Sequence, residues 1–481
     1  MKKLNIIKKE RKTINYATAN VVPQKFFPYL YDLNPIYATV DSSVILGRDK
    51  EINRICNCFF KSKRANAVLV GEHGVGKTAI VQKLVDNVIH KRCPKEMYDF
   101  HFLALNVEAI VADIVRKSDK VNNILAKIVE FVSNATNLVI VIDQIQLIQA
   151  DYYLSYKFAT LVRNPRVKIL GISTEEEFYS YFELDKKTRS RLEVIPILEP
   201  KPNRIYPMIK KIVAGLENAH RVTIDKNIIK YIINVSSAIS SELCNPELTL
   251  DIIEKSMIVA RRKHRKEVTR KDVNSNFNFN YELYSKMSKE DKKITAYHEA
   301  GHFIVSKMSE NIKNIKTTAI TIVPAEDFLG ATMFEFEPEK QESCDVQYYI
   351  DNIAVDLAGR EAEIIFTNSE KHLTSGAYQD LISATQTARD IVTSYGMIDN
   401  VGHNMSYLGI EDFTNISLLS ENIKNEINSA VEKLILDAEN RAKEILNKHK
   451  PLLERLAKEL MSNEILDESD LERICREVEG K

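Results

Sequence analysis

Apolar positions in the first half of the chain follow two different periods. Between residues 45 and 200, short β-rich apolar runs alternate with stretches that repeat at the 3.6-residue period of amphipathic helices. The runs lie at residues 67–70, 101–105, 138–142, 167–170 and 194–198. Because strands and helices alternate, this region predicts a parallel sheet covered by helices on both faces.

The rest of the chain is predicted to be mainly helical. Residues 201–273 show a helical pattern only, an Asn-rich segment at 274–280 interrupts it, and the helical pattern then resumes with one β-like stretch at 318–336. The expected fold class is thus α/β plus α. We predict an irregular N-terminal extension (1–40), an α/β domain (41–200), a helical lid (201–273), a linker (274–284) and a mainly helical domain (285–481).

Composition limits the number of domains, the partners and the cellular location that we expect. A length of 481 residues fits about three domains. The 67 basic and 67 acidic residues cancel, which argues against a nucleic-acid partner. No apolar run approaches the ~18 residues that cross a bilayer, the N-terminus lacks a signal-peptide pattern, and the six cysteines are sparse. We expect a cytoplasmic protein with reduced thiols and no membrane contact.

A phosphate-binding loop is predicted near residue 70. Gly71-Glu-His-Gly74-Val-Gly76-Lys77-Thr78 fits the pattern G-x-x-x-x-G-K-[ST], and it lies between a β-rich run and a helical stretch. The glycines let backbone N–H groups and the helix N-terminus face the phosphates. Lys77 is placed to reach the β- and γ-phosphates and Thr78 to hold Mg²⁺, so the expected cofactor is ATP with Mg²⁺.

A second strand end completes this predicted site. The run at 138–142 ends in Asp143, where a carboxylate would complete the Mg²⁺ shell. ATPases of this type usually carry a glutamate at the next position to polarise the attacking water, but this chain has Gln144 there. An amide cannot act as a carboxylate base. Nucleotide binding with weak or absent hydrolysis is therefore one of the alternatives.

Residues 45–255 resemble the first AAA+ module of Clp-type unfoldases. The similarity is carried by residues 45–51, the phosphate loop, residues 106–111, the Asp143 strand and residues 171–200. It implies a hexameric ring with ATP at the subunit interfaces, in which Thr174 is the sensor and Arg191 reaches a neighbour's nucleotide. Besides Gln144, two positions depart from the family: Ser190 replaces a second arginine, and Arg116 stands where the family has a substrate-gripping aromatic.

A metal site is predicted near residue 300. His298-Glu299-Ala-Gly-His302 lies in a helical stretch, so the two histidines share one helix face and can bind one Zn²⁺. Glu299 is placed to take a proton from the metal-bound water. A catalytic zinc needs a third protein ligand. The spacing alone leaves four candidates, Asp380, His372, Glu361 and Glu363.

Residues 290–475 resemble the peptidase domain of the FtsH family. The similarity is carried by residues 295–302, 357–363 and 373–380, and it extends to the helix at 438–445. It implies that Asp380 is the third ligand of one Zn²⁺ per chain, and that zinc-bound water attacks the peptide bond with Glu299 as general base. Residues 328–332 match the family's edge strand, where substrate would add as an extended strand. His372 would then lie near the ligands or on the surface.

Three functions follow from these motifs. The leading one is an ATP-dependent zinc metalloendopeptidase, a homo-hexamer that degrades cytoplasmic proteins or peptides. The second keeps the peptidase on a ring that binds ATP but hydrolyses it weakly or not at all, so that only unfolded polypeptides are cut; Gln144, Arg116 and Ser190 favour it. The third is a non-proteolytic assembly protein switched by nucleotide, and the complete zinc motif argues against it.

Overall fold

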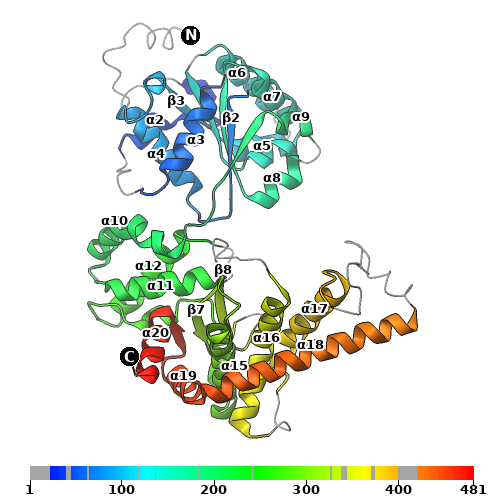
Figure 1. Ribbon diagram of the computed structural model, residues 1–481. Coiled ribbons are helices and arrows are strands. Elements are labelled where there is room, and N and C mark those ends of the chain that lie inside the picture. Colours follow the sequence, from blue (N-terminus) through cyan, green and yellow to red (C-terminus); the bar gives the residue numbers. More distant parts are fainter. Residues whose placement is uncertain are drawn as a thin grey trace. The chain divides into compact units, whose positions relative to one another are not determined.

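The structure of the protein is a computed structural model (Figure 1). It describes residues 22–39, 45–61, 64–116, 119–135, 137–182, 185–239, 243–325, 328–336, 344–369, 374–398 and 420–480. Contacts divide the chain into two units. The N-terminal unit is Met1–Asp225 with Ser241–Val268, and the C-terminal unit is Lys226–Ser240 with Thr269–Lys481.

The described part of the N-terminal unit contains a six-stranded sheet in the order β1-β3-β4-β5-β2-β6. The strands are β1 (Leu30–Asp32), β2 (Asn66–Val70), β3 (His101–Leu105), β4 (Leu138–Ile142), β5 (Lys168–Ser173) and β6 (Leu192–Pro196). Five of them are parallel, and β1 joins one edge antiparallel to β3. Every residue of β2, β3 and β4 is buried, as expected for strands covered on both faces. The predicted parallel sheet is confirmed.

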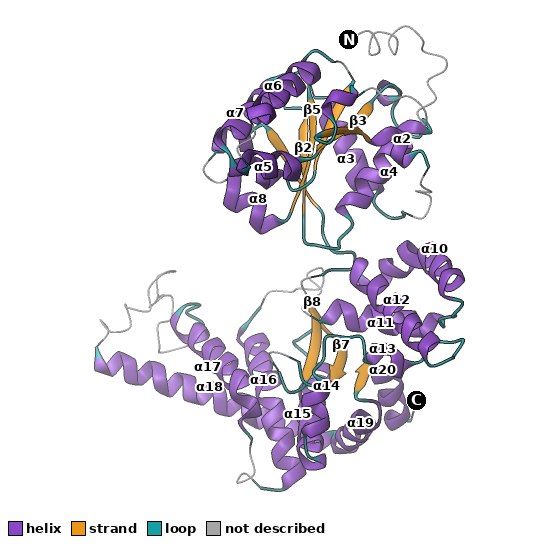
Figure 2. Cartoon of the chain, turned by 180° about the vertical axis from the view of Figure 1, so that it is seen from behind, coloured by secondary structure: helices purple, strands orange, loops and turns teal. Residues whose placement is uncertain are grey.

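Helices cover both faces of this sheet (Figure 2). Alternate strand residues point to opposite faces, so Val68 belongs to the core beneath one helical layer and Leu69 to the core beneath the other. The helices of this unit include α3 (Asp49–Phe59), α4 (Lys77–Ile89), α5 (Val107–Val115), α6 (Asp119–Ser133), α7 (Tyr152–Arg163), α8 (Glu175–Phe182), α9 (Lys186–Arg189), α10 (Pro202–His220) and α12 (Glu247–Arg262).

The expectation of an irregular extension over residues 1–40 is wrong for its last part. Leu30–Asp32 form strand β1, and α2 (Leu33–Tyr37) follows directly. Asp32 caps α2 by accepting a hydrogen bond from the Asn34 backbone, and the buried Asn34 amide donates to Phe100 O. Both elements are too short to show a hydrophobic period in the sequence. They form because residues far along the chain pair with them or hydrogen-bond to them. Residues 1–21 lie outside the described residues.

The C-terminal unit places helices around a small antiparallel sheet with the order β8-β7-β9. The strands are β7 (Ile315–Thr321), β8 (Ala331–Phe336) and β9 (Ile465–Asp467). The predicted β-like stretch therefore contains β8 and part of β7. The helices are α11 (Lys226–Ala238), α13 (Arg270–Asn274), α14 (Tyr281–Lys286), α15 (Lys289–Met308), α16 (Val346–Thr367), α17 (Tyr378–Thr393), α18 (Glu421–Lys448), α19 (Lys450–Asn463) and α20 (Glu468–Glu479). Contacts group α11 with this unit, and the predicted domain boundaries stay a prediction.

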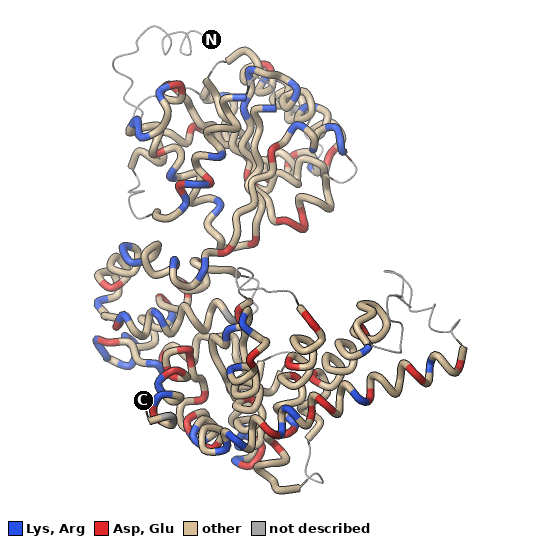
Figure 3. Tube along the Cα trace, viewed as in Figure 1, with Lys and Arg blue, Asp and Glu red and all other residues tan. Residues whose placement is uncertain are grey.

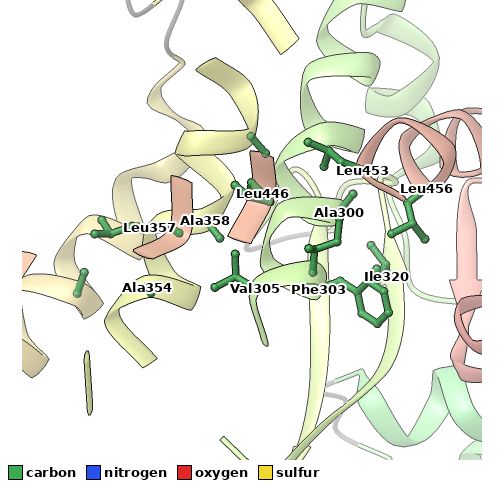
Figure 4. Close-up of a cluster of buried hydrophobic side chains, with 14 of the residues drawn as sticks. Ala300, Phe303, Val305, Ile320, Ala354, Leu357, Ala358, Leu446, Leu453 and Leu456 are labelled. Carbon is green, nitrogen blue, oxygen red and sulfur yellow. The ribbon is translucent and has the colours of Figure 1, made fainter. Parts of the chain in front are cut away.

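Small residues bring the helices of this core close together. In Figure 4, Ala300 of α15 lies between the side chains of α16, such as Ala358, and those of α19, such as Leu456. A Cβ atom on Gly301 would lie 2.5 Å from the Ala358 carbonyl oxygen, so only glycine permits this approach of α15 to α16. The packing fixes the two helices that carry most of the candidate site.

Helices of both units carry charges of both signs (Figure 3). The longest described helix, α18, has 28 residues and follows this mixed pattern. Within the described ranges, no helix combines the length and the apolar character that crossing a membrane requires.

Candidate metal centre and nucleotide site

Helix α15 carries the predicted residues His298, Glu299 and His302. Its start is fixed by a capping box, in which Ser288 Oγ accepts a hydrogen bond from the Asp291 backbone (3.0 Å) and the Asp291 carboxylate accepts one from the Ser288 backbone (3.3 Å). The two histidines are about one turn apart, so their rings lie on one face of the helix. All three side chains are buried.

Each histidine ring is oriented by a partner on α16. His298 Nδ1 lies 2.7 Å from Glu363 Oε1, and His302 Nδ1 lies 2.7 Å from the Val355 carbonyl oxygen. A carbonyl oxygen can only accept, so His302 donates through Nδ1, and its Nε2 faces the other histidine. The Nε2 atoms of the two rings are 3.1 Å apart. Metal-binding histidines commonly have such partners on their other ring nitrogen.

Asp380 joins the two histidines from helix α17. Its Oδ2 lies 3.2 Å from His298 Nε2 and 3.6 Å from His302 Nε2. Potential ligand atoms of the three residues all lie within 4.8 Å of one another. Two imidazoles and one carboxylate are a ligand set suited to zinc that leaves a fourth position open.

Glycine shapes the space beside these ligand atoms. A Cβ atom on Gly359 of α16 would lie 2.5 Å from His298 Nε2 and 2.6 Å from His302 Nε2. Any larger residue would push the rings from their positions. The fixed ring orientations, the donor set and this cradle fit a zinc ion.

The other candidates for a third ligand have different surroundings. Both carboxylate oxygens of Glu363 already have hydrogen-bond partners. Oε1 contacts His298 Nδ1, and Oε2 accepts a hydrogen bond from the Thr374 backbone N–H at 3.2 Å. Glu361 is buried on α16 and lies 3.7 Å from Lys443 Nζ on α18. His372 lies outside the described residues.

Strand β8 supports Glu299. Thr332 Oγ1 lies 2.8 Å from Glu299 Oε2 and 2.9 Å from the Glu299 carbonyl oxygen. Gly330 leaves room on the other side, since a Cβ there would lie 2.9 Å from Glu299 Oε1. Burial raises the pKa of Glu299, while the nearby histidines and Thr332 lower it in part. A buried carboxyl with a raised pKa is suited to taking up a proton.

The charge of Asp380 is stabilised by its neighbours. Burial acts to raise the pKa of this carboxyl, but the hydrogen bond with His298 and the nearby His302 ring outweigh it and hold the pKa below its ordinary value. Asp356 behaves differently: burial raises its pKa to about 6, although it hydrogen-bonds with Ser383. Asp380 thus stays charged beside the two histidines, as a carboxylate that binds a cation must.

Sequence reasoning missed Thr332 and Thr374, which hold Glu299 and Glu363 respectively. Threonine has no distinctive spacing that would mark it, and each contact crosses from one element to another, over 33 residues for Thr332 and 11 for Thr374. Thr332 lay within the segment resembling an edge strand, so its place on β8 was the only available signal.

The phosphate loop connects β2 to α4 in the N-terminal unit. Gly74 and Gly76 have φ angles of +87° and +94°, which favour glycine. Gly76 precedes α4, and no side-chain hydrogen bond caps the helix there, so its first N–H groups face outward. Lys77 Nζ lies 2.5 Å from the Gly71 carbonyl oxygen and 2.8 Å from that of Glu72. This cradle fits a phosphate chain.

Two residues beside the phosphate loop extend this site. Arg48 donates to the Val75 carbonyl oxygen of the phosphate loop at 2.7 Å, a brace that sequence reasoning missed. Thr78 is exposed in the first turn of α4. Its predicted contact with Mg²⁺ stays a prediction.

The carboxyl end of β4 lies beside that of β3. Burial raises the pKa of Asp143, an effect that the nearby Lys77 opposes and that Glu108, which follows β3, reinforces. Gln144 has a left-handed backbone, with φ of 51°, which is uncommon for a non-glycine residue. Its Nε2 donates a hydrogen bond of 2.6 Å to Glu108 Oε1.

The residues that match the AAA+ pattern, Thr174 and Arg191, and those that depart from it, Ser190 and Arg116, lie on several different elements. Thr174 is buried before α8 and donates to Glu177 Oε2 at 2.7 Å. Arg191 is exposed just before β6, and Ser190 donates to the Lys187 carbonyl oxygen. Arg116 ends α5 with its side chain 78% exposed. The roles predicted for Thr174 and Arg191 stay predictions.

Comparison with known proteins identifies two kinds of relative. Residues 285–474 match the model of peptidase family M41. The chain is 34% identical over 235 residues to an ATP-dependent zinc metalloprotease FtsH of Neorickettsia risticii, covering 48% of this chain and 36% of that protein. It is 28% identical over 231 residues to a chaperone protein ClpB of Wolinella succinogenes, covering 47% of this chain and 27% of that protein.

A solved structure, a closed-state cryo-EM reconstruction of Hsp104 with ATPyS and FITC casein, aligns with a TM-score of 0.47 at 18% identity, covering 60% of this chain and 51% of that one. The present chain spans well under half the length of the curated relatives described above. The chain thus joins an AAA+ module similar to that of ClpB to an FtsH-like domain similar to peptidase family M41.

Proposed function

We propose that this protein is a zinc-dependent endopeptidase whose action on folded proteins depends on ATP. The observation that carries the proposal is the convergence of His298, His302 and Asp380 beside the buried Glu299. The FtsH relatives, described as ATP-dependent zinc metalloproteases, support the same activity. A homo-hexamer acting on cytoplasmic proteins is part of this proposal.

His298, His302 and Asp380 would hold the zinc ion. Zinc bound there would polarise the scissile carbonyl and lower the pKa of a water molecule. Glu299 would take a proton from the attacking water and pass it to the nitrogen of the leaving amine. Thr332 would keep the Glu299 carboxylate in place, and Glu363 would keep the His298 ring in place.

Strand β8 would bind the substrate as an added strand. It lies at the edge of the described sheet, and its residue Thr332 contacts Glu299. Residues two apart share a face, so Phe334 and Phe336 lie on the same face as Thr332, and they are 41% and 52% exposed. Apolar side chains of a paired peptide would pack against these rings.

Replacing both Phe334 and Phe336 by threonine should therefore raise KM for an apolar unfolded peptide. We expect kcat/KM to fall about tenfold, the effect of losing two cross-strand contacts. Steady-state cleavage of a fluorogenic peptide measures it, with Leu436→Gln as a control that removes an exposed apolar residue from α18. An unchanged KM would exclude this face as a substrate contact.

A second candidate function keeps the peptidase on a ring that binds ATP without turning it over at a useful rate. Gln144 is the observation that favours it, because its amide cannot accept a proton from water. Only unfolded polypeptides would then be cut.

One assay tests both functions. A folded and an unfolded substrate are incubated with ATP, with a non-hydrolysable analogue, without nucleotide, and with a zinc chelator. The chelator should abolish all cleavage, and the folded substrate should be cut only with ATP. Cleavage of the unfolded substrate alone, equal under all nucleotide conditions, would favour the second function. Undiminished cleavage in the chelator would contradict both.

A further inference from the structure

We infer that Glu108 supplies the carboxylate that Gln144 lacks, and acts as the general base for ATP hydrolysis. The inference rests on the proposed nucleotide site. It assigns the proton-accepting role to a residue on a different strand end from the one where ATPases of this type usually carry it.

The sheet brings the two residues together. Strands β3 and β4 are parallel neighbours, with Ala104 opposite Val141, so both chains leave the same edge of the sheet. Ligands of open α/β sheets bind at the carboxyl ends of the strands. Glu108 follows β3, Gln144 and Asp143 follow β4, and the phosphate loop follows β2, all at the same edge of the parallel sheet.

The local geometry holds the Glu108 carboxylate beside Gln144, which occupies the position of the missing base. Asn106 caps α5 by accepting a hydrogen bond from the Ala109 backbone at 3.0 Å, and this places Glu108 in the first turn of the helix. Gln144 Nε2 then donates to Glu108 Oε1 at 2.6 Å. A carboxylate thus lies one hydrogen bond from the Gln144 amide, and both side chains are exposed to solvent that can reach them.

The chemistry gives each residue a distinct role. The oxygen of a water molecule forms a bond to the γ-phosphorus, and the bond from that phosphorus to the bridging oxygen of ADP breaks. Glu108 accepts the proton that the water loses and returns it to the released phosphate. Gln144 orients the carboxylate through its amide, as a hydrogen-bond donor that does not change its protonation.

The test is Glu108→Gln in the full-length protein. Steady-state ATP turnover should fall at least about 100-fold, while the dissociation constant for a fluorescent ADP analogue changes less than about threefold. The nucleotide recovered from the variant after incubation with ATP should be ATP, where the wild type yields ADP. Glu130→Gln, which changes an exposed glutamate on α6, should leave turnover unchanged.

The exchanged pair gives a second variant. Glu108→Gln combined with Gln144→Glu restores one carboxylate at the site and should recover at least a tenth of the wild-type turnover. Wild-type turnover in Glu108→Gln would overturn the inference, and so would equal losses of ADP binding and turnover, which indicate a structural role. A wild type that binds ATP but does not hydrolyse it also overturns it, whereas one that binds no nucleotide contradicts the proposed nucleotide site itself.

Discussion

Glu299→Gln should abolish peptide-bond cleavage while leaving zinc in place. The substitution keeps the size of the side chain and its hydrogen-bonding capacity toward Thr332, which lies 2.8 Å from Glu299 Oε2. It removes the group that can take up a proton, and loss of a general base costs ~10²- to 10⁴-fold in rate. The measurement is casein cleavage under conditions where the wild type is linear with time.

Zinc content distinguishes this result from a damaged site. The variant should bind close to one zinc ion per chain, because His298, His302 and Asp380 are unchanged and Glu299 itself is outside the ligand group. Thr332→Val is a useful companion, since it removes the hydroxyl that holds the carboxylate but leaves the carboxylate itself. It should retain more activity than Glu299→Gln. Substantial cleavage by Glu299→Gln would exclude Glu299 as the base.

The sheet of the N-terminal unit could be predicted because its central strands are buried on both faces. Such strands appear as continuous apolar runs, and β2, β3 and β4 all do so. The three-residue strands β1 and β9 could not be predicted. Their formation depends on pairing with β3 and β7, which lie far away in the chain.

The candidate site shows the same distinction between local and distant information. The spacing of His298 and His302 is a local property of one helix, so their shared face could be predicted. Spacing could not choose Asp380 over Glu363, and only the family resemblance did. The structure places both carboxylates against His298, one on each ring nitrogen. Which ring nitrogen each carboxylate contacts depends on how α16 and α17 pack around α15. A short sequence motif does not predict this packing.

Asp380→Ala should reduce zinc well below one ion per chain. Two imidazoles would remain, and a zinc site with one of three protein ligands removed loses the carboxylate that balances the ion's charge. Glu363 cannot replace Asp380 without releasing His298 Nδ1, from which it lies 2.7 Å. Metal analysis after dialysis against a zinc-buffered solution measures the occupancy, and circular dichroism checks that the variant keeps the helix content of the wild type.

Two control variants show whether a loss of zinc in Asp380→Ala is specific to a metal ligand. Asp390→Ala removes a carboxylate from the same helix, one that accepts a hydrogen bond from Gln386, and it should leave zinc unchanged. Glu363→Gln weakens only the partner of a ligand, so zinc affinity should fall about 10- to 100-fold while the site can still be filled at high zinc. If Asp380→Ala instead kept full occupancy, the third ligand would be another residue, and His372 would be the first to replace. The order of zinc affinity, with wild type and Asp390→Ala above Glu363→Gln and Glu363→Gln above Asp380→Ala, therefore separates a ligand from a residue that orients one.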